Sequence, residues 1–163
     1  METTIKQRLY SSLFLALLWV ILLSSEGCFR ERAQLQEPST DLGRIQFETH
    51  CAACHQPDGS GAEGGGPPLA GSSWVRGPES RLIRIVLQGR RGPIEVGGEI
   101  YNREMLGFGS VVNDGQIAAI LTYVRGQWGD IDRPVREEDV SRIRGATADR
   151  IAYWTVDELL QTP

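Results

Sequence analysis

The sequence predicts an all-α fold for one domain, preceded by an export segment and followed by a short extension. Two segments, residues 79–88 and 113–128, carry the apolar spacing of amphipathic helices. The 163 residues suffice for one ordinary domain, and 19 glycines with 8 prolines demand many turns rather than a large β-sheet. Hydrophobic residues make up 40% of the chain and charged residues 23%, which is a globular composition.

The charges of the chain exclude two classes of function. A net charge of −4 argues against nucleic acid as a partner, because nucleic acid requires a basic surface. Lys6 is the only lysine, so every basic residue beyond the N-terminal segment, apart from the two histidines, is an arginine. Catalysis through a lysine Schiff base is therefore excluded for the rest of the chain.

Residues 1–27 have the pattern of a signal peptide or an N-terminal anchor. Lys6 and Arg8 precede an uncharged stretch that runs from residue 9 to residue 25. A basic start followed by a short apolar run is typical of a secretory signal. These 17 residues are marginal for crossing a bilayer, which takes about 20 apolar residues in a helix.

A cysteine follows this segment at the place where a bacterial lipoprotein carries its lipid. Ser25 and Gly27 are small residues just before Cys28, which makes Cys28 a candidate for lipidation. An uncleaved helical anchor and simple secretion are the alternatives. Residues 28–40 are polar and lack periodicity, so they are expected to form a tether. We expect the domain to lie on the periplasmic side of a bacterial membrane.

The two remaining cysteines form a CxxCH motif with Cys51, Cys54 and His55. A thioredoxin-like pair needs a preceding strand, and residues 41–50 show no strand alternation. A zinc site needs two further ligands, while the only other histidine is the adjacent His50. Covalent attachment of haem c needs two thiols at this spacing and a histidine directly after the second. The motif therefore predicts one covalent haem c with His55 bound to its iron.

The first amphipathic helix is expected over residues 79–88, after Pro78 and before Gly89. Charged and aromatic residues around it are candidates to bind the haem propionates, because a buried carboxylate needs charge-assisted partners. Ordinary surface or packing roles remain open for each of them. These candidates are Trp74, Arg81, Arg90 and Arg91.

The second axial ligand is expected to be Met105. His50 directly precedes Cys51 and cannot reach the opposite face of the same haem. Beyond the export segment Met105 is the only methionine, and it lies in a glycine-rich loop rather than on an apolar helix face. A thioether is a soft ligand that favours Fe(II). The alternative is that Met105 only fills the core, which is the common role of methionine.

The second amphipathic helix is expected to begin after Asn113 and to end near Trp128. Asn113 and Gln116 have the spacing of a capping box. Downstream of the cap, an apolar stripe follows the helical period. Its members are Ile117, Ile120, Leu121, Val124 and Trp128.

Residues 41–129 resemble the class I cytochromes c, which are small all-helical electron carriers with one haem. Gly43 and Phe47 have the family's spacing ahead of the haem motif. The stretch Gly66–Leu69 matches the family's Gly-Pro-x-Leu turn, and the residues around Met105 resemble its methionine loop. The family's usual proline after the methionine is a leucine here.

This resemblance implies three or more helices around one covalently bound haem c, with His55 and Met105 as axial ligands in both Fe(III) and Fe(II). It implies that the Pro67 carbonyl accepts a hydrogen bond from His55 Nδ1 and that Leu69 lines the haem pocket. It also implies that the helix near Gly43 crosses the last helix of the domain.

Residues 130–163 form a C-terminal extension. Val140, Ile143 and Arg144 indicate one short helix, and residues 154–160 indicate a second helix or a docking strip. Arg150 and the stretch from Trp154 resemble tails of cytochrome modules in periplasmic dehydrogenases. Packing over the cytochrome is the alternative.

The resulting expectation is a membrane-tethered electron carrier, not an enzyme. Its partners would be redox proteins such as a dehydrogenase, an oxidase or another cytochrome, which dock transiently near the haem edge. The first alternative is a cytochrome subunit of a periplasmic dehydrogenase or oxidase complex. The second is a haem peroxidase or gas sensor, which the lack of a distal histidine disfavours.

Overall fold

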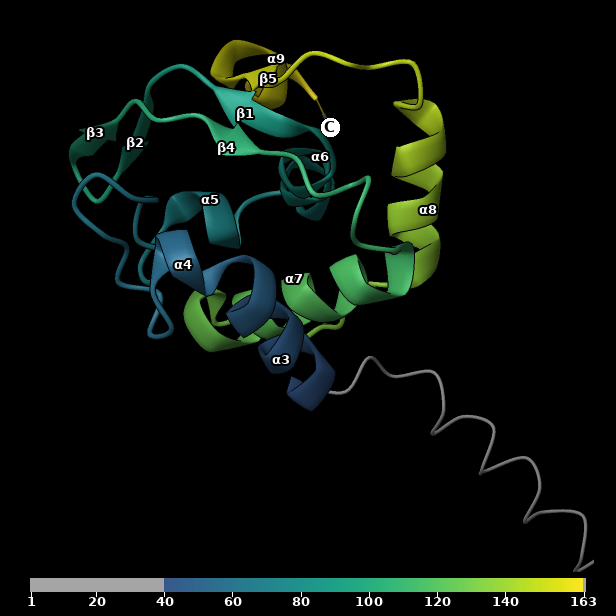
Figure 1. Cartoon of the computed structure of the whole chain (residues 1–163), viewed down its shortest axis with the longest axis horizontal. Coiled ribbons are helices and arrows are strands. Elements are labelled where there is room, and N and C mark those ends of the chain that lie inside the picture. Colours follow the sequence, from purple (N-terminus) through teal and green to yellow (C-terminus); the bar gives the residue numbers. More distant parts are fainter. Residues whose placement is uncertain (1–39, 163) are drawn as a thin grey trace, which may run out of the picture. The chain divides into compact units, whose positions relative to one another are not determined.

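The computed structural model describes residues 40–162, which contain seven helices and five short strands (Figure 1). The predicted signal or anchor, Cys28 and the tether up to residue 39 lie outside the described residues. The helices are α3 (Thr40–His50), α4 (Ala52–His55), α5 (Ser73–Arg76), α6 (Glu79–Gln88), α7 (Asp114–Gly129), α8 (Glu137–Ala146) and α9 (Val156–Gln161). The strands are β1 (Gly89–Arg91), β2 (Ile94–Val96), β3 (Glu99–Tyr101), β4 (Met105–Leu106) and β5 (Trp154–Thr155).

The packing of α3 against α7 forms the centre of the domain. The two helices approach so closely at Gly43 that a Cβ atom there would lie 2.3 Å from the Ala119 carbonyl oxygen. One turn later Phe47, which is buried, meets the rings of Tyr123 and Trp128 at centroid distances of 5.6 and 5.1 Å. The expected crossing of the first and last helices of the domain is thus present.

Both amphipathic helices lie where the sequence predicts them. In α7 the Asn113 side chain accepts from the Gln116 amide at 2.9 Å, and the Gln116 side chain accepts from the Asn113 amide at 3.0 Å. This capping box satisfies two amides at the start of α7. Helix α6 begins after Pro78 and ends at Gln88, and its C-cap Gly89 has a φ of 77°, a left-handed value that favours glycine.

The short strands are an addition to the predicted helices. Strand β1 lies in the middle of a three-stranded sheet, antiparallel to β4 and parallel to β5. Strands β2 and β3 form a separate antiparallel hairpin. Met105, predicted in a loop, therefore belongs to a strand, because its backbone pairs with Arg90 of β1. The mostly helical fold that the sequence predicts is otherwise confirmed.

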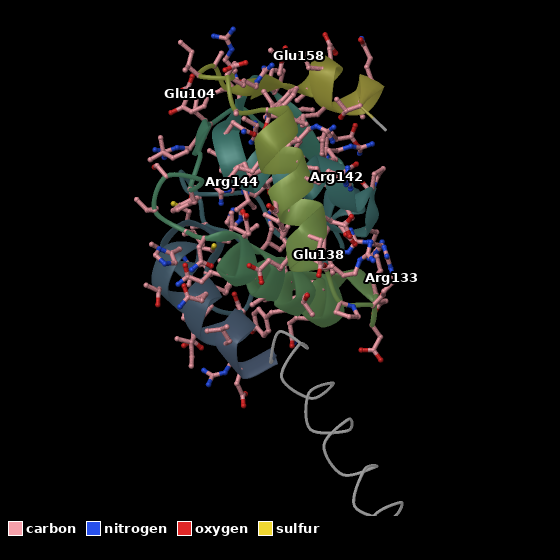
Figure 2. All side chains as sticks on the ribbon, turned by 90° about the vertical axis from the view of Figure 1, so that its right-hand side faces the viewer. Glu104, Arg133, Glu138, Arg142, Arg144 and Glu158 are labelled. Carbon is pink, nitrogen blue, oxygen red and sulfur yellow. The ribbon has the colours of Figure 1, made fainter. Side chains whose placement is uncertain are left out.

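The C-terminal residues pack on the same domain. Helix α8 lies between α7 and α9 in Figure 2, and its buried Val140 and Ile143 join the main apolar core. Trp154 and Leu159 form a smaller apolar cluster with Ile85 of α6. Within residues 40–162 no helix is long and apolar enough to span a membrane.

Candidate functional site

A cavity of about 410 Å³ lies among α3, α4, the loop of residues 64–72, α5, α6, β1, β2, β4 and α7. This volume is within the range of binding sites for small molecules and cofactors, about 300–1,000 Å³. Its wall is largely apolar and includes core-facing residues of α6 and α7. All six residues that the sequence predicts for the site line it, namely Cys51, Cys54, His55, Pro67, Leu69 and Met105.

Cys51 lies at the junction between α3 and α4, and Cys54 lies within α4. Cys51 is half-buried, Cys54 is exposed, and both are free thiols. The His55 amide donates to the Cys51 carbonyl at 3.0 Å, so the whole motif fits within one helical turn. Burial, with a smaller contribution from Cys54, raises the pKa of the Cys51 thiol to about 12. Both cysteines line the cavity, and both come from this one short segment.

His55 is buried and its orientation is fixed by the loop that follows. Its Nδ1 lies 2.9 Å from the Pro67 carbonyl oxygen, which can only accept a hydrogen bond. Nδ1 therefore carries the proton, and Nε2 keeps its lone pair. Burial lowers the pKa of His55, Arg90 lowers it further, and the bond to Pro67 partly opposes them. The imidazole is thus held neutral, as a metal ligand must be.

Gly66 allows the loop to pass directly over this ring. A Cβ atom at Gly66 would lie 2.9 Å from both Cε1 and Nδ1 of His55, which is closer than real Cβ contacts. The glycine before Pro67 is therefore required for the carbonyl to reach the imidazole. Leu69, two residues after Pro67, is half-buried against the main apolar core.

Met105 reaches the cavity from β4. Its side chain is half-buried and contacts both apolar clusters of the domain. The strand pairing of Met105 with Arg90 fixes its backbone. His50 also lines the cavity, and its ring meets Phe108 edge-on at a centroid distance of 6.1 Å.

Arg90 is the one buried cation that lines the cavity among residues 40–162. Its side chain is 3% exposed, and its Nη1 donates to the Gly92 carbonyl oxygen at 2.7 Å. No carboxylate within the described part of the chain pairs with it, and burial lowers its pKa. A buried cation without an anion is costly, so the cavity favours a ligand with a negative group.

The other propionate candidates take different positions. Trp74 lines the cavity, and its Nε1 donates to the Glu95 carbonyl oxygen at 3.2 Å. Arg81 lies over the Trp74 ring, with its guanidinium carbon 5.1 Å from the centroid. Arg91 is exposed and does not line the cavity. Of the four candidates, Trp74 and Arg90 are therefore brought to the site.

Two buried residues of a single strand are among the lining residues that the sequence reasoning missed. Ile94 and Val96 of β2 are buried and line the cavity, while Glu95 between them is exposed. This alternation of buried and exposed residues is the signal of a strand with one face on the core. It was too short to stand out between two glycine-containing turns.

The donor set of this cavity fits haem c. An apolar wall suits the macrocycle, the thiol pair suits its two vinyl groups, and the neutral imidazole and the thioether suit its iron. The buried Arg90 suits a propionate. Within residues 40–162 no group of three or more His, Cys, Asp or Glu side chains could hold a metal ion, so the cysteines lack the additional ligands of a zinc site.

Comparison with known proteins gives a consistent result. A family model described as cytochrome c matches residues 40–128. The chain is 38% identical over 103 residues to cytochrome c-552 of Thermus thermophilus, covering 58% of this chain and 78% of that protein. It is 37% identical over 111 residues to the gluconate 2-dehydrogenase cytochrome c subunit of Pantoea cypripedii, covering 64% of this chain and 24% of that protein. It is 31% identical over 88 residues to the Cbb3-type cytochrome c oxidase subunit FixP of Azorhizobium caulinodans, covering 53% of this chain and 29% of that protein.

Proposed function

Because this chain belongs to the cytochrome c family, whose members transfer electrons and carry haem c, we propose that it is an electron carrier with His55 and Met105 as axial ligands. The observation that carries this proposal is that Cys51, Cys54, His55 and Met105 all line the same cavity. When bound, haem c supplies a one-electron couple, because its iron alternates between Fe(III) and Fe(II).

Different residues of the chain would bind different parts of the haem. Cys51 and Cys54 would hold it covalently through thioether bonds, and the hydrogen bond that His55 Nδ1 donates to the Pro67 carbonyl oxygen keeps His55 in the orientation of a ligand. Met105 supplies a sulfur ligand from the separate strand β4. With His55 and Met105 both bound to the iron, no position on the metal would be open to a substrate, which supports an electron carrier over an enzyme.

Arg90 is proposed to hold a propionate, and Trp74 is proposed to pack against the ligand. The Arg90 guanidinium is buried in the cavity wall and lacks an ion pair among the described residues, so a propionate would supply its missing anion. Trp74 uses its indole N–H on the Glu95 carbonyl, which leaves it an apolar role against the ligand.

We place this carrier on the periplasmic side of a bacterial membrane. Lys6 and Arg8 ahead of the apolar stretch support export, and Cys28 supports a lipid anchor. An uncleaved N-terminal helix would serve the same purpose. Labelling cells with a radioactive fatty acid and comparing the wild type with Cys28→Ala distinguishes the two, because only lipidation at Cys28 is lost in the variant.

The partners are proposed to be redox proteins. Two of the relatives are named as the cytochrome subunits of a gluconate 2-dehydrogenase and a cbb3-type oxidase. Their names favour a second candidate function, in which this chain is a subunit of such a complex. The C-terminal residues that suggested docking are used within the domain, since Arg150 pairs with Glu158 at 2.7 Å and stacks on Trp154 at 3.6 Å. That internal use supports the carrier over the subunit.

Visible spectra of the holoprotein test the ligand assignment. We expect a sharp haem c band on reduction, a weak far-red band from sulfur-to-Fe(III) charge transfer, and no binding of carbon monoxide. A spectrum without the sulfur band, together with rapid binding of carbon monoxide, would indicate an open iron and favour a peroxidase or gas sensor.

Substitution of the sulfur ligand gives the first mutational prediction. Met105→Ala should keep the covalent haem, lose the far-red band, lower the reduction potential and admit carbon monoxide, because the soft ligand that favours Fe(II) is gone. His50→Ala is the matched control, since His50 also lines the cavity, and it should leave all four properties unchanged. An unchanged potential in Met105→Ala would refute the assignment.

A further inference from the structure

Backbone hydrogen bonds to α6 and β1 hold one edge of the segment that carries Met105. This segment, residues 105–112, is called the Met105 segment below. The Phe108 and Gly109 amides donate to the Val86 and Leu87 carbonyl oxygens at 2.8 and 3.0 Å. These bonds use the N–H groups of the segment and satisfy carbonyls at the end of α6. Further along, Ser110 and Val111 are exposed, and Val111 keeps 69% of its accessible surface.

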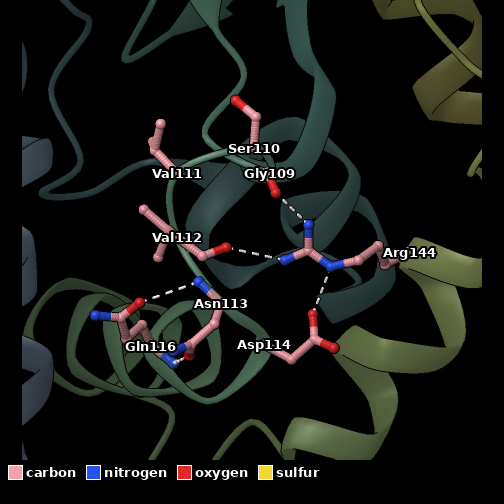
Figure 3. A pocket seen from close by; sticks show the side chains of 8 residues that line it. All are labelled: Gly109, Ser110, Val111, Val112, Asn113, Asp114, Gln116 and Arg144. Carbon is pink, nitrogen blue, oxygen red and sulfur yellow. Dashed lines mark hydrogen bonds and ion pairs between the residues drawn. The ribbon is translucent and has the colours of Figure 1, made fainter.

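The opposite edge of the Met105 segment is held by one side chain of the C-terminal extension. Arg144 of α8 donates from Nη1 to the Gly109 carbonyl oxygen and from Nη2 to the Val112 carbonyl oxygen at 3.0 Å (Figure 3). Its Nε donates to the Asp114 carboxylate at 2.6 Å, at the start of α7. The planar fork of a guanidinium suits such a set of fixed acceptors, and charge-assisted bonds are the stronger kind.

The extension also supports the other end of the Met105 segment. Arg90 of β1 pairs with Met105 on one side and with Trp154 of β5 on the other. The Trp154 side chain belongs to the small apolar cluster that Met105 contacts. Residues beyond α7 therefore support both ends of the segment that presents the thioether.

We propose that Arg144 is a positioning residue, which holds the Met105 segment against the cavity and thereby keeps the Met105 sulfur in its place as a ligand. This inference rests on the proposed ligation by Met105. A thioether is neutral and a weak acceptor, so it draws little electrostatic attraction of its own and its retention depends on the backbone that presents it. Loss of the Arg144 bonds frees two carbonyls of that backbone and lets the segment move outward.

The test compares two arginines of the same helix in the full-length holoprotein. Arg144→Gln removes the three-way contact, whereas Arg142→Gln removes an exposed arginine whose described partner is Asp139. Figure 2 shows both side chains on α8. We measure the far-red sulfur band, the reduction potential and the rate of carbon monoxide binding by the reduced protein, well below the unfolding midpoint of each variant.

We expect Arg144→Gln to weaken the far-red band, lower the potential and bind carbon monoxide about tenfold faster, since charge-assisted bonds of this kind shift an opening equilibrium by at least about that factor. Arg142→Gln should match the wild type in all three. Arg144→Lys should fall between Gln and the wild type, because an ammonium keeps the charge but loses the fork. If Arg144→Gln does not yield holoprotein, Arg144→Lys decides by the same three readouts.

The inference is overturned if Arg144→Gln, or Arg144→Lys in its place, lowers only the thermal midpoint and leaves band, potential and carbon monoxide rate as in the wild type. Met105→Ala, run in parallel, separates this failure from failure of the proposed ligation. A band that is present in the wild type and lost in Met105→Ala, but unaffected at Arg144, refutes only the positioning role. A wild type without the band refutes the ligation and the positioning role together.

Discussion

His55 and Arg90 line the same cavity and show how burial sets the chemistry of single residues. Burial lowers the pKa of both side chains, but His55 responds by staying neutral, whereas a guanidinium remains charged over any practical pH range. The histidine is thereby prepared as a ligand, and the arginine becomes a fixed positive charge inside the domain. Such a charge should disfavour the more positive oxidation state of a nearby iron.

Arg90→Gln should therefore lower the reduction potential of the holoprotein, by an amount on the order of tens of millivolts. The potential should also become more dependent on pH, because a propionate that loses its cation takes up a proton more readily. Potentiometric titration at several pH values measures both effects. Arg91→Gln is the matched control, since Arg91 is the exposed neighbour of Arg90, and equal shifts in the two variants would contradict the role of Arg90.

At the scale of elements, the helices could be predicted because their signals are local. The cap at Asn113 and the stop at Gly89 lie next to the helices that they bound. The haem motif and the turn at Pro67 were likewise readable, since each is contiguous in the sequence. Strand β1 could not be predicted, because its residues show no alternation of their own and are ordered by partners that lie far along the chain. The contacts of Arg144 with Gly109 and Val112 were missed for the same reason.

The crossing of α3 and α7 gives a prediction on stability. Gly43→Ala should lower the free energy of unfolding by about 1–3 kcal/mol, because the added methyl group meets the Ala119 carbonyl at 2.3 Å and forces the helices apart. Gly126→Ala is the control on the same helix pair, since its Cβ would meet nothing nearer than the Ile131 oxygen at 4.0 Å. That substitution should raise the free energy by about 0.5–1 kcal/mol. Denaturant titration of the holoproteins measures both, and a neutral Gly43→Ala would contradict the close crossing.

At the scale of the whole molecule, the C-terminal residues stabilise the domain through a small polar network. The Glu158 carboxylate accepts from the Thr155 amide at 2.8 Å and from Arg150 at 2.7 Å, and Arg150 stacks on the Trp154 ring. The Thr155 amide first, and then Arg150, lower the pKa of Glu158 to about 2. The folded protein therefore keeps this carboxylate ionised over a pH range in which the unfolded chain protonates it.

Ionised Glu158 stabilises the folded protein at neutral pH, and this stabilisation is lost in acid. The contribution of Glu158 is complete above its ordinary pKa of about 4.5, and it is lost progressively as the pH falls towards 2. Amide hydrogen exchange in β5 and α9 should accelerate relative to the rest of the domain across this window. In Glu158→Gln exchange should already be fast at neutral pH and should lack this acid-dependent step. Asp157→Asn, at the exposed neighbour, serves as the control and should behave as the wild type does.

The order of the sheet β4-β1-β5 has a consequence for the assembly of the protein in time. The cysteine motif lies early in the chain, while β5 and α9 lie at its end. A growing chain therefore displays both thiols and His55 before the strand that backs Arg90 and Met105 exists. Every residue that lines the cavity precedes β5 in the sequence, so at that stage the chain holds the whole lining but lacks the strand that supports β1 from behind. The linear order of the elements therefore places the lining of the cavity first and its outer support last.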